Sequence, residues 1–161
     1  MERRAAQVTT TRDADRAIGT ITVAFVADPA MRWIYPDPSR YLVGFPKLVG
    51  ALGQGAFEKG TAHEASEFAG VALWLRPGGQ ADPALLGRVI QATVDPRQVP
   101  RLLAVLEALD RWHPAEPHWY LPFIGVDTPR QRTGLGSELL RHALEEIDAE
   151  HAPAYLETAN P

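Results

Sequence analysis

The amino-acid sequence predicts an α/β (α+β) fold, in which helices flank a central sheet. Near its end, two apolar extended segments, 118–126 and 154–158, enclose a helix over about 134–150 whose apolar residues recur at helical spacing. Such a strand–helix–strand unit favours a right-handed crossover between neighbouring, parallel strands. Upstream, the extended segments 61–67 and 69–75 are typical of a hairpin.

Two helices are predicted in the first third of the chain. Asp13 is a typical N-cap for a helix over 14–26, because Asp accepts hydrogen bonds from the free N–H groups of a first turn. A second helix, over about 39–55, is capped by its first residue, a serine, and interrupted by Pro46. Between them, prolines bracket residues 31–35, which we expect to form an irregular aromatic segment.

Two further helices are predicted in the middle of the chain, over 83–93 and 96–112. Each begins with a proline in its first turn after an aspartate, Asp82 or Asp95, which is a common start signal. Leucine and valine recur along one face of the second helix, so we expect that face to pack against the rest of the protein.

Composition limits the function classes. The 161 residues, 45% of them hydrophobic, suffice for one domain with a buried core. The formal net charge of −4 provides no general attraction to nucleic acid. No cysteine is present, which excludes disulfides and thiolate chemistry, and the five histidines show no metal-site spacing, so no metal is expected. Without a signal peptide or an 18-residue apolar run, we expect a soluble, cytoplasmic protein without membrane contacts.

The segment from the strand at 118–126 into the following helix has the character of an anion site. Gly134 and Gly136 flank one residue where a loop becomes a helix, so backbone N–H groups there can approach a bulky anion. The first N–H groups of a helix lack intrahelical partners, and the helix dipole adds partial positive charge. Arg130 and Arg132 add charge beside them. The alternative is that the two glycines only form a tight turn.

The order Gln131-x-x-Gly134-x-Gly136, directly after an apolar strand and a Val-Asp-x-Pro turn, is similar to the coenzyme A-binding motif of the GNAT acetyltransferase superfamily. The specific part of the resemblance covers about 118–160. It implies a mixed, mostly antiparallel central sheet flanked by helices, and a single acyl-CoA-binding domain over 1–161. The helical pair at about 82–113 is then an insertion.

The resemblance also implies site residues. In such enzymes the strand before the loop separates from its parallel neighbour at a bulge, and its backbone groups bind the pantetheine arm of acetyl-CoA. Here those groups belong to Ile124, Gly125 and Val126, and Pro122 and Gly125 fit a broken ladder. Asn160 matches a position that often contacts the cofactor. The diphosphate is expected on the loop and first helical turn, at Gln131, Arg132, Thr133, Gly134, Leu135, Gly136 and Ser137.

The implied activity is transfer of an acetyl group from acetyl-CoA to a primary amine of a small molecule or peptide, by direct attack. An amine must lose a proton first, so a general base is needed. His118 at the start of the motif strand and Glu67 are the candidates, with Glu64 and Glu116 as further carboxylates beside expected cleft strands. Trp33 and Tyr35, between prolines, are candidates for a substrate-facing wall.

The sequence departs from the family pattern at its end. A full GNAT domain continues past residue 161 with another helix and two strands, and that helix usually carries the tyrosine that protonates the leaving thiolate. We therefore expect a C-terminally truncated domain with an unprotected edge strand. Impaired activity or unusual assembly, such as a homodimer formed by strand exchange, is an expected consequence.

Two alternatives remain open on sequence grounds. A GNAT-like module could bind coenzyme A without turnover. A dinucleotide-binding protein is also compatible with strand, Gly-x-Gly, helix, strand and then Glu157. Against that alternative, Leu139 occupies the third glycine position, and no room follows for more parallel strands.

Overall fold

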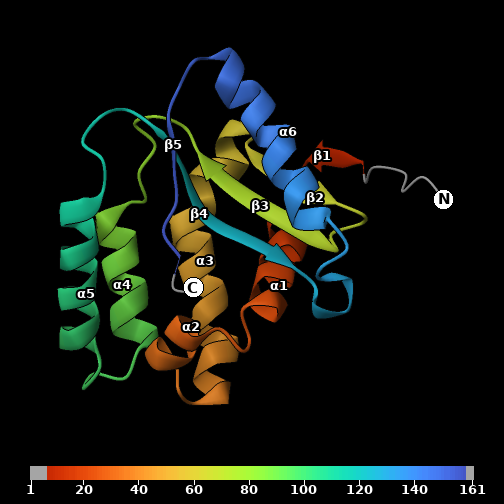
Figure 1. The fold of residues 1–161 in the computed structure, drawn as a ribbon. Coiled ribbons are helices and arrows are strands. Elements are labelled where there is room, and N and C mark those ends of the chain that lie inside the picture. The colour runs from red at the N-terminus through yellow and green to blue at the C-terminus, as the bar shows by residue number, and fades with distance from the viewer. Residues whose placement is uncertain (1–6, 159–161) are drawn as a thin grey trace.

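A five-stranded sheet forms the centre of the molecule (Figure 1). The computed structural model describes residues 7–158. The strands follow the order β1-β2-β3-β4-β5; the first four are antiparallel neighbours, and β5 pairs with β4 in parallel. The predicted α/β fold with a mostly antiparallel sheet is therefore confirmed. The strands are β1 (Val8–Thr10), β2 (Ala62–Ala65), β3 (Gly70–Leu75), β4 (Trp119–Val126) and β5 (Ala154–Tyr155).

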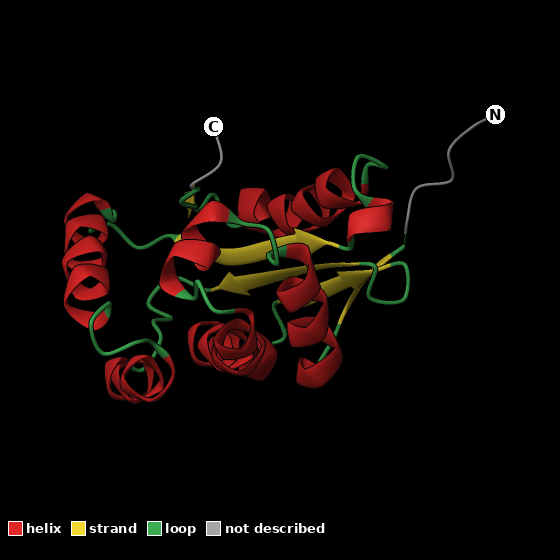
Figure 2. Ribbon diagram, turned by 90° about the horizontal axis from the view of Figure 1, so that it is seen from below, coloured by secondary structure: helices red, strands yellow, loops and turns green. Residues whose placement is uncertain are grey.

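Helices cover both faces of this sheet (Figure 2). Helix α6 packs on one face, while α1 and α3 pack on the other, and α4 and α5 stand beside α3 away from the sheet (Figure 1). The helices are α1 (Ala14–Ala24), α2 (Pro29–Ile34), α3 (Pro38–Lys59), α4 (Pro83–Thr93), α5 (Val99–Trp112) and α6 (Leu135–Ala149), with a 3₁₀ turn at Thr128–Arg130. Among residues 7–158, no helix is long and apolar enough to cross a bilayer.

Aspartate caps explain most helix starts, and they correct two predicted boundaries. Asp13 caps α1 as predicted, by accepting from the Arg16 N–H. Helix α3 begins at Pro38 rather than Ser39, because the Asp37 carboxylate accepts from the N–H groups of Ser39 and Arg40. Pro46 lies inside α3 and does not end it.

The segment predicted to be irregular forms a helix, and the second of the two helices in the middle of the chain begins later than predicted. Residues 29–34 form α2, because Asp28 accepts from the Met31 N–H and Pro29 occupies the first turn. Helix α5 begins only at Val99, since Asp95 accepts from the Arg97 N–H in the preceding turn. The expectation that the apolar face of α5 packs against the rest of the protein is wrong for most of that face. Leu102 is buried, but Leu103, Val105 and Leu109 are exposed.

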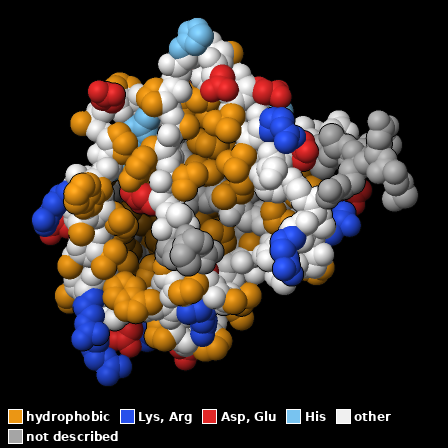
Figure 3. Space-filling view, in the orientation of Figure 1, with side chains coloured by type: hydrophobic (Ala, Val, Ile, Leu, Met, Phe, Trp, Pro, Cys, Tyr) orange, Lys and Arg blue, Asp and Glu red, His pale blue; other side chains and the backbone are white. Residues whose placement is uncertain are grey.

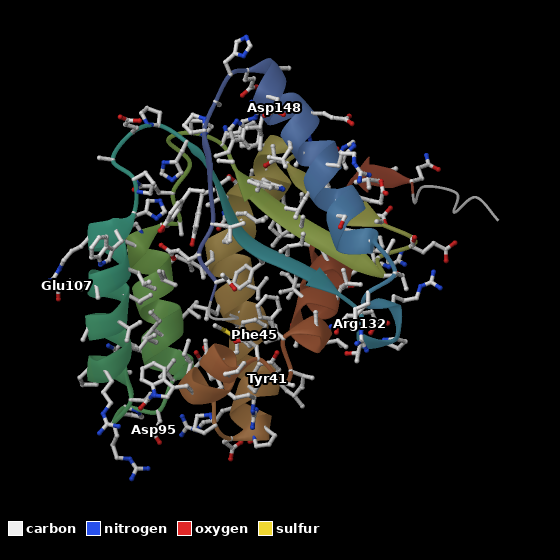
Figure 4. The ribbon with its side chains drawn as sticks, in the orientation of Figure 1. Tyr41, Phe45, Asp95, Glu107, Arg132 and Asp148 are labelled. Atoms are coloured by element: carbon white, nitrogen blue, oxygen red, sulfur yellow. The ribbon has the colours of Figure 1, made fainter. Side chains whose placement is uncertain are left out.

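The core divides into two clusters, one on each face of the sheet. On the α1/α3 face, Phe45 stacks on Tyr41 with ring centroids 5.0 Å apart and meets Phe123 of β4 edge-on at 5.9 Å (Figure 4). On the α6 face, Trp74 and Trp119 are buried against Leu139 and its neighbours. Trp74 is thus a core residue of β3.

Strand β4 contains a bulge that changes which side chains face each cluster. Leu73 pairs with Phe123 and Leu75 with Tyr120, so between these pairs one residue of β3 opposes two of β4. The extra residue lies at Leu121–Pro122, where proline donates no ladder hydrogen bond. This bulge lies in the pairing with the antiparallel neighbour β3, whereas the predicted break is from the parallel neighbour. That β4–β5 ladder ends at Tyr120, two residues before Pro122.

Gly125 serves a different purpose from the one predicted. It stays paired with Val71, beyond the bulge. A Cβ atom built on Gly125 would lie 2.8 Å from the Ala24 Cβ and 3.1 Å from the Ile21 Cδ1. The missing side chain therefore lets α1 approach β4 closely, and it does not mark a bulge.

We expect Gly125→Ala to destabilise the fold by about 1–3 kcal/mol, because α1 must move to admit the methyl group. Urea unfolding measures this free energy. Gly87→Ala is the matched control, since Gly87 lies in α4 with nothing within 4 Å of its Cβ position. It should be neutral or stabilising. Equal stability of the Gly125→Ala and wild-type proteins would contradict the close approach.

His63 of β2 is a buried titratable group on the α6 face. Its side chain is 3% exposed, its Nδ1 has no hydrogen-bond partner among the described residues, and its ring meets that of His142 at 4.8 Å. Burial, with the nearby His142, lowers the pKa of His63 to about 4 from 6.5. The folded state therefore holds His63 neutral.

This lowered pKa makes stability fall with acid. Between pH 6.5 and about 4 the unfolded chain binds a proton at His63 that the folded protein excludes, so stability present above pH 6.5 is lost as the pH falls. We expect His63→Leu to remove a loss on the order of 2 kcal/mol between pH 7 and pH 5, measured by urea unfolding. His151→Asn, at an exposed turn, should retain the wild-type pH dependence.

Candidate functional site

Two side-chain hydrogen bonds fix the conformation of the loop between β4 and α6. The Gln131 side-chain amide donates to the Val126 carbonyl at 3.1 Å, and the Thr133 hydroxyl donates to the Arg130 carbonyl at 2.6 Å. Arg132 and Gly134 have positive φ angles of 60° and 99°. Gly134, the residue before α6, has no side chain that could cap the helix, and residues 131–134 are exposed, so the start of this helix faces solvent.

The backbone N–H groups of this turn are available to a ligand. Within residues 7–158, the N–H groups from Arg132 to Ser137 donate no hydrogen bond to the protein. Nothing lies within 4 Å of a Cβ position at Gly134. Arg132 projects from the surface of the loop beside the α6 terminus (Figure 4). The residues present therefore fit a diphosphate, which such amide groups bind with charge-assisted hydrogen bonds.

One edge of β4 is open beside this turn. The β4–β5 ladder consists of Trp119 with Ala154 and Tyr120 with Tyr155, after which the two strands separate. The Asp127 N–H donates to the Ala69 carbonyl, so alternation along β4 turns the backbone groups of Gly125 toward β3 and those of Ile124 and Val126 toward the open edge. Of the three predicted backbone sites, the structure therefore presents Ile124 and Val126, but not Gly125.

Two adjoining cavities follow that open edge. The first, of about 360 Å³, lies between the α1–α2 connection, the end of β4 and Gln131. The second, of about 320 Å³, lies between the same connection, the β4 bulge and residues 156–158. They share Phe25, Asp28 and Ile124, so we describe them together as the β4 groove. It runs from the loop before α6, at Gln131, to the point where β4 and β5 separate.

A cluster of titratable side chains lies at the far end of the groove. The Nε2 atoms of His113 and His118 are 3.0 Å apart, and His113 Nδ1 lies 3.6 Å from Glu157 Oε1. The Tyr155 hydroxyl donates to the same carboxylate oxygen at 3.0 Å, and its ring stacks on Tyr120. Burial, followed by the nearby Glu157 and Tyr155, raises the pKa of Tyr120 to about 12, so that this phenol stays protonated.

This histidine cluster separates the groove from a third cavity. That cavity, of about 350 Å³, is lined by His113, His118 and Tyr120 together with residues 78–81 and the carboxylate-bearing Asp110 and Glu116. Glu157 lines the groove side. A carboxylate–imidazole pair at such a boundary can accept a proton from a group that enters by either cavity.

The two predicted base candidates do not share a site. Glu67 is exposed on the β2–β3 turn. The last residue of that turn, Ala69, accepts a hydrogen bond from the Asp127 N–H, so Glu67 lies near the end of β4 that leads into the loop before α6. His118 precedes the other end of this eight-residue strand, roughly 25 Å away at ~3.3 Å per residue. Glu64 accepts from the Thr9 hydroxyl and the Phe68 N–H, so it stabilises the hairpin turn, and Glu116 is exposed.

Of the two residues predicted to face a substrate, Tyr35 is buried and Trp33 is exposed. Tyr35 is 1% exposed, and its hydroxyl shares a 2.9 Å hydrogen bond with the Thr93 hydroxyl inside the core. The sequence predicts an irregular segment here, whereas α2 ends at Ile34 and leaves Tyr35, its C-cap, turned into the core. Trp33 is 41% exposed but lines neither the groove nor the third cavity. Asn160 lies outside the described residues.

Sequence reasoning missed His113 and Glu157 as members of a site. No motif in the sequence includes His113, and Glu157 fits only the acidic position of a dinucleotide-binding pattern. They are far apart in sequence, so no local spacing links them. A weak signal existed: His113 and His118 bracket a short Pro-containing turn that leads directly into the motif strand.

The surface carries an apolar patch, and the described residues form no metal-binding group. Apolar side chains gather between α6 and the segment after β5 (Figure 3). Leu144 of α6 and Leu156 are among the exposed large apolar residues. Over residues 7–158, no group of three or more His, Asp or Glu side chains is arranged to hold a metal ion.

Known proteins share this sequence pattern and fold. The model of the acetyltransferase (GNAT) family matches residues 61–161. A Corynebacterium glutamicum protein named histone acetyltransferase HPA2 and related acetyltransferase is 26% identical, with a TM-score of 0.65 over 98% of this chain and 78% of that one. A candidate acetyltransferase from Pyrococcus horikoshii is 14% identical, with a TM-score of 0.54 over 95% of this chain and 80% of that one, and shows the fold alone.

Proposed function

Since this chain belongs to the GNAT acetyltransferase family, whose chemistry is acetyl-CoA-dependent acyl transfer, we propose that it moves an acetyl group to a primary amine of a small molecule or peptide. The observation that carries the proposal is the β4 groove. It joins an unpartnered helix N-terminus to an open strand edge, which are the two backbone surfaces that a diphosphate and an amide-bearing arm require.

The chain's own residues account for binding along the groove. The N–H groups from Arg132 to Ser137 would hold the diphosphate, with Arg130 and Arg132 contributing charge. Ile124 and Val126 would pair with the pantetheine arm as a neighbouring strand does. The acetyl-CoA thioester supplies the acyl group at the end of the groove.

We place the reaction at the far end of the groove, beside the β4 bulge. Leu121, Pro122 and Leu156 line it, which favours exclusion of water from the reacting carbonyl. The Ile124 N–H faces the open edge and is the nearest backbone donor of β4 for a developing oxyanion, because proline has no N–H. The histidine cluster lies beyond this end, where an acceptor amine would meet the thioester.

Gly136→Asp tests binding at the turn without disturbing the fold. A Cβ at Gly136 meets only the Val126 Cγ2 atom, at 3.9 Å. A carboxylate in the first turn of α6 should leave stability unchanged or raise it by about 0.3–1 kcal/mol, while repelling a diphosphate. We expect acetyl-CoA affinity to fall at least about tenfold by isothermal titration, since each charge-assisted hydrogen bond contributes about 1.5–3 kcal/mol.

Gly19→Asp introduces the same charge in α1, where the Cβ position is open, and should keep wild-type affinity. Release of free thiol from acetyl-CoA across a panel of primary amines then tests turnover. Binding without thiol release from any amine would favour a coenzyme A-binding module. A protein that binds NADH and ignores coenzyme A would contradict both readings.

A further inference from the structure

The protons of the His113–His118 pair can be assigned from its contacts. His118 Nδ1 lies 2.7 Å from the Glu116 carbonyl oxygen. A carbonyl oxygen only accepts, so His118 Nδ1 carries a hydrogen and donates it. In a neutral imidazole the other nitrogen is then an acceptor, so His118 Nε2 presents a lone pair.

The second contact follows from the first. His118 Nε2 and His113 Nε2 are 3.0 Å apart, which requires one hydrogen between them. Because His118 Nε2 is the acceptor, His113 Nε2 must donate. Three of the four ring nitrogens are now engaged, and the remaining one, His113 Nδ1, carries a lone pair.

That remaining nitrogen faces a carboxylate. His113 Nδ1 lies 3.6 Å from Glu157 Oε1, and the two side chains are 29% and 25% exposed. A lone pair gains nothing from this neighbour, whereas an N–H⁺ would be attracted to it. The other groups around the ring are Tyr120 and Tyr155, whose rings meet it edge-on at 4.9 and 5.0 Å, and Asp110 on the same cavity wall. His113 Nδ1 is therefore the one ring nitrogen of the pair whose lone pair faces a carboxylate and not a hydrogen-bond donor.

We propose that His113, rather than His118, is the catalytic base for the acceptor amine, and that His118 and Glu157 are positioning residues that hold its Nδ1 ready. This inference rests on the proposed acetyl transfer. His113 lines the third cavity and its partner Glu157 lines the end of the groove, so the His113–Glu157 pair links the two cavities.

The proton balance is complete without another reactant. The ammonium form of the acceptor gives one proton to His113 Nδ1 and becomes the free amine. Its nitrogen forms the new N–C bond while the C–S bond breaks, and the departing sulfur takes the electron pair and the second amine proton. His113 then releases its proton to solvent, which restores the neutral pair.

The first test needs no acceptor and no turnover. In ¹⁵N-labelled full-length protein at pH 8.5, imidazole NMR should show His113 protonated at Nε2 and bare at Nδ1, and His118 protonated at Nδ1. His113→Gln and His118→Gln assign the signals. His118→Gln should also remove the single tautomer of His113. A His113 ring that carries its hydrogen on Nδ1 would overturn the assignment.

The second test is kinetic, with thiol release measured against pH using the best amine of the panel. His113→Gln should lower kcat/KM about 100-fold or more and remove the acidic limb of the profile. His118→Gln and Glu157→Gln should each lower kcat/KM less and displace that limb without removing it. His151→Asn is the control and should keep the wild-type profile.

The outcomes separate this inference from the proposed function. Acetyl-CoA binding by His113→Gln, measured by isothermal titration, should match the wild type, because His113 does not line the groove. If the wild type turns over and His113→Gln keeps its acidic limb, the cluster is structural and the inference fails while acetyl transfer stands. If no amine is acetylated, acetyl transfer fails and the inference that depends on it fails as well, even where NMR finds the expected tautomers.

Discussion

Strand β4 has two different edges, and this difference is the constraint on which the rest of the site depends. One edge is paired with β3 from Tyr120 to Val126, apart from the bulge, while the other pairs with β5 for only two residues. A strand with unpaired backbone groups is costly unless something satisfies them. The bulge at Leu121–Pro122 reduces that cost, since proline has no N–H to satisfy. An extended ligand arm can then occupy the place of a neighbouring strand.

The packing of helices on β4 preserves this opening. Gly125 lets α1 approach one face of the strand, and the α1–α2 connection then forms a wall of the groove. On the opposite face, α6 buries Leu135, Leu139, Ala143 and Ile147. That burial positions the N-terminus of α6 beside the end of β4, where its free N–H groups face solvent. Apolar packing on both faces thus holds a polar binding surface along the edge.

Helices α4 and α5 contact both the core and the histidine cluster. Tyr35 and Thr93 join α4 to the core by a buried hydrogen bond, for which the absence of a side chain at Gly44 leaves room. The end of α5 carries His113 to the segment after β5. Family membership predicts acyl transfer in general, and the arrangement of His113, His118 and Glu157 is read from the structure and not from that membership.

Much of the fold was determined by local sequence. Asp13, Asp82 and the apolar face of the last helix predicted three helices, and the spacing of Gln131, Gly134 and Gly136 predicted a turn whose N–H groups are in fact free. These signals are readable because caps, turns and periodicity act within a few residues. Tertiary structure alone decided that Tyr35 is buried, that Glu67 lies at the wrong end of β4, and that His113 meets Glu157. Each of these depends on contacts between segments distant in sequence, which periodicity and capping do not encode.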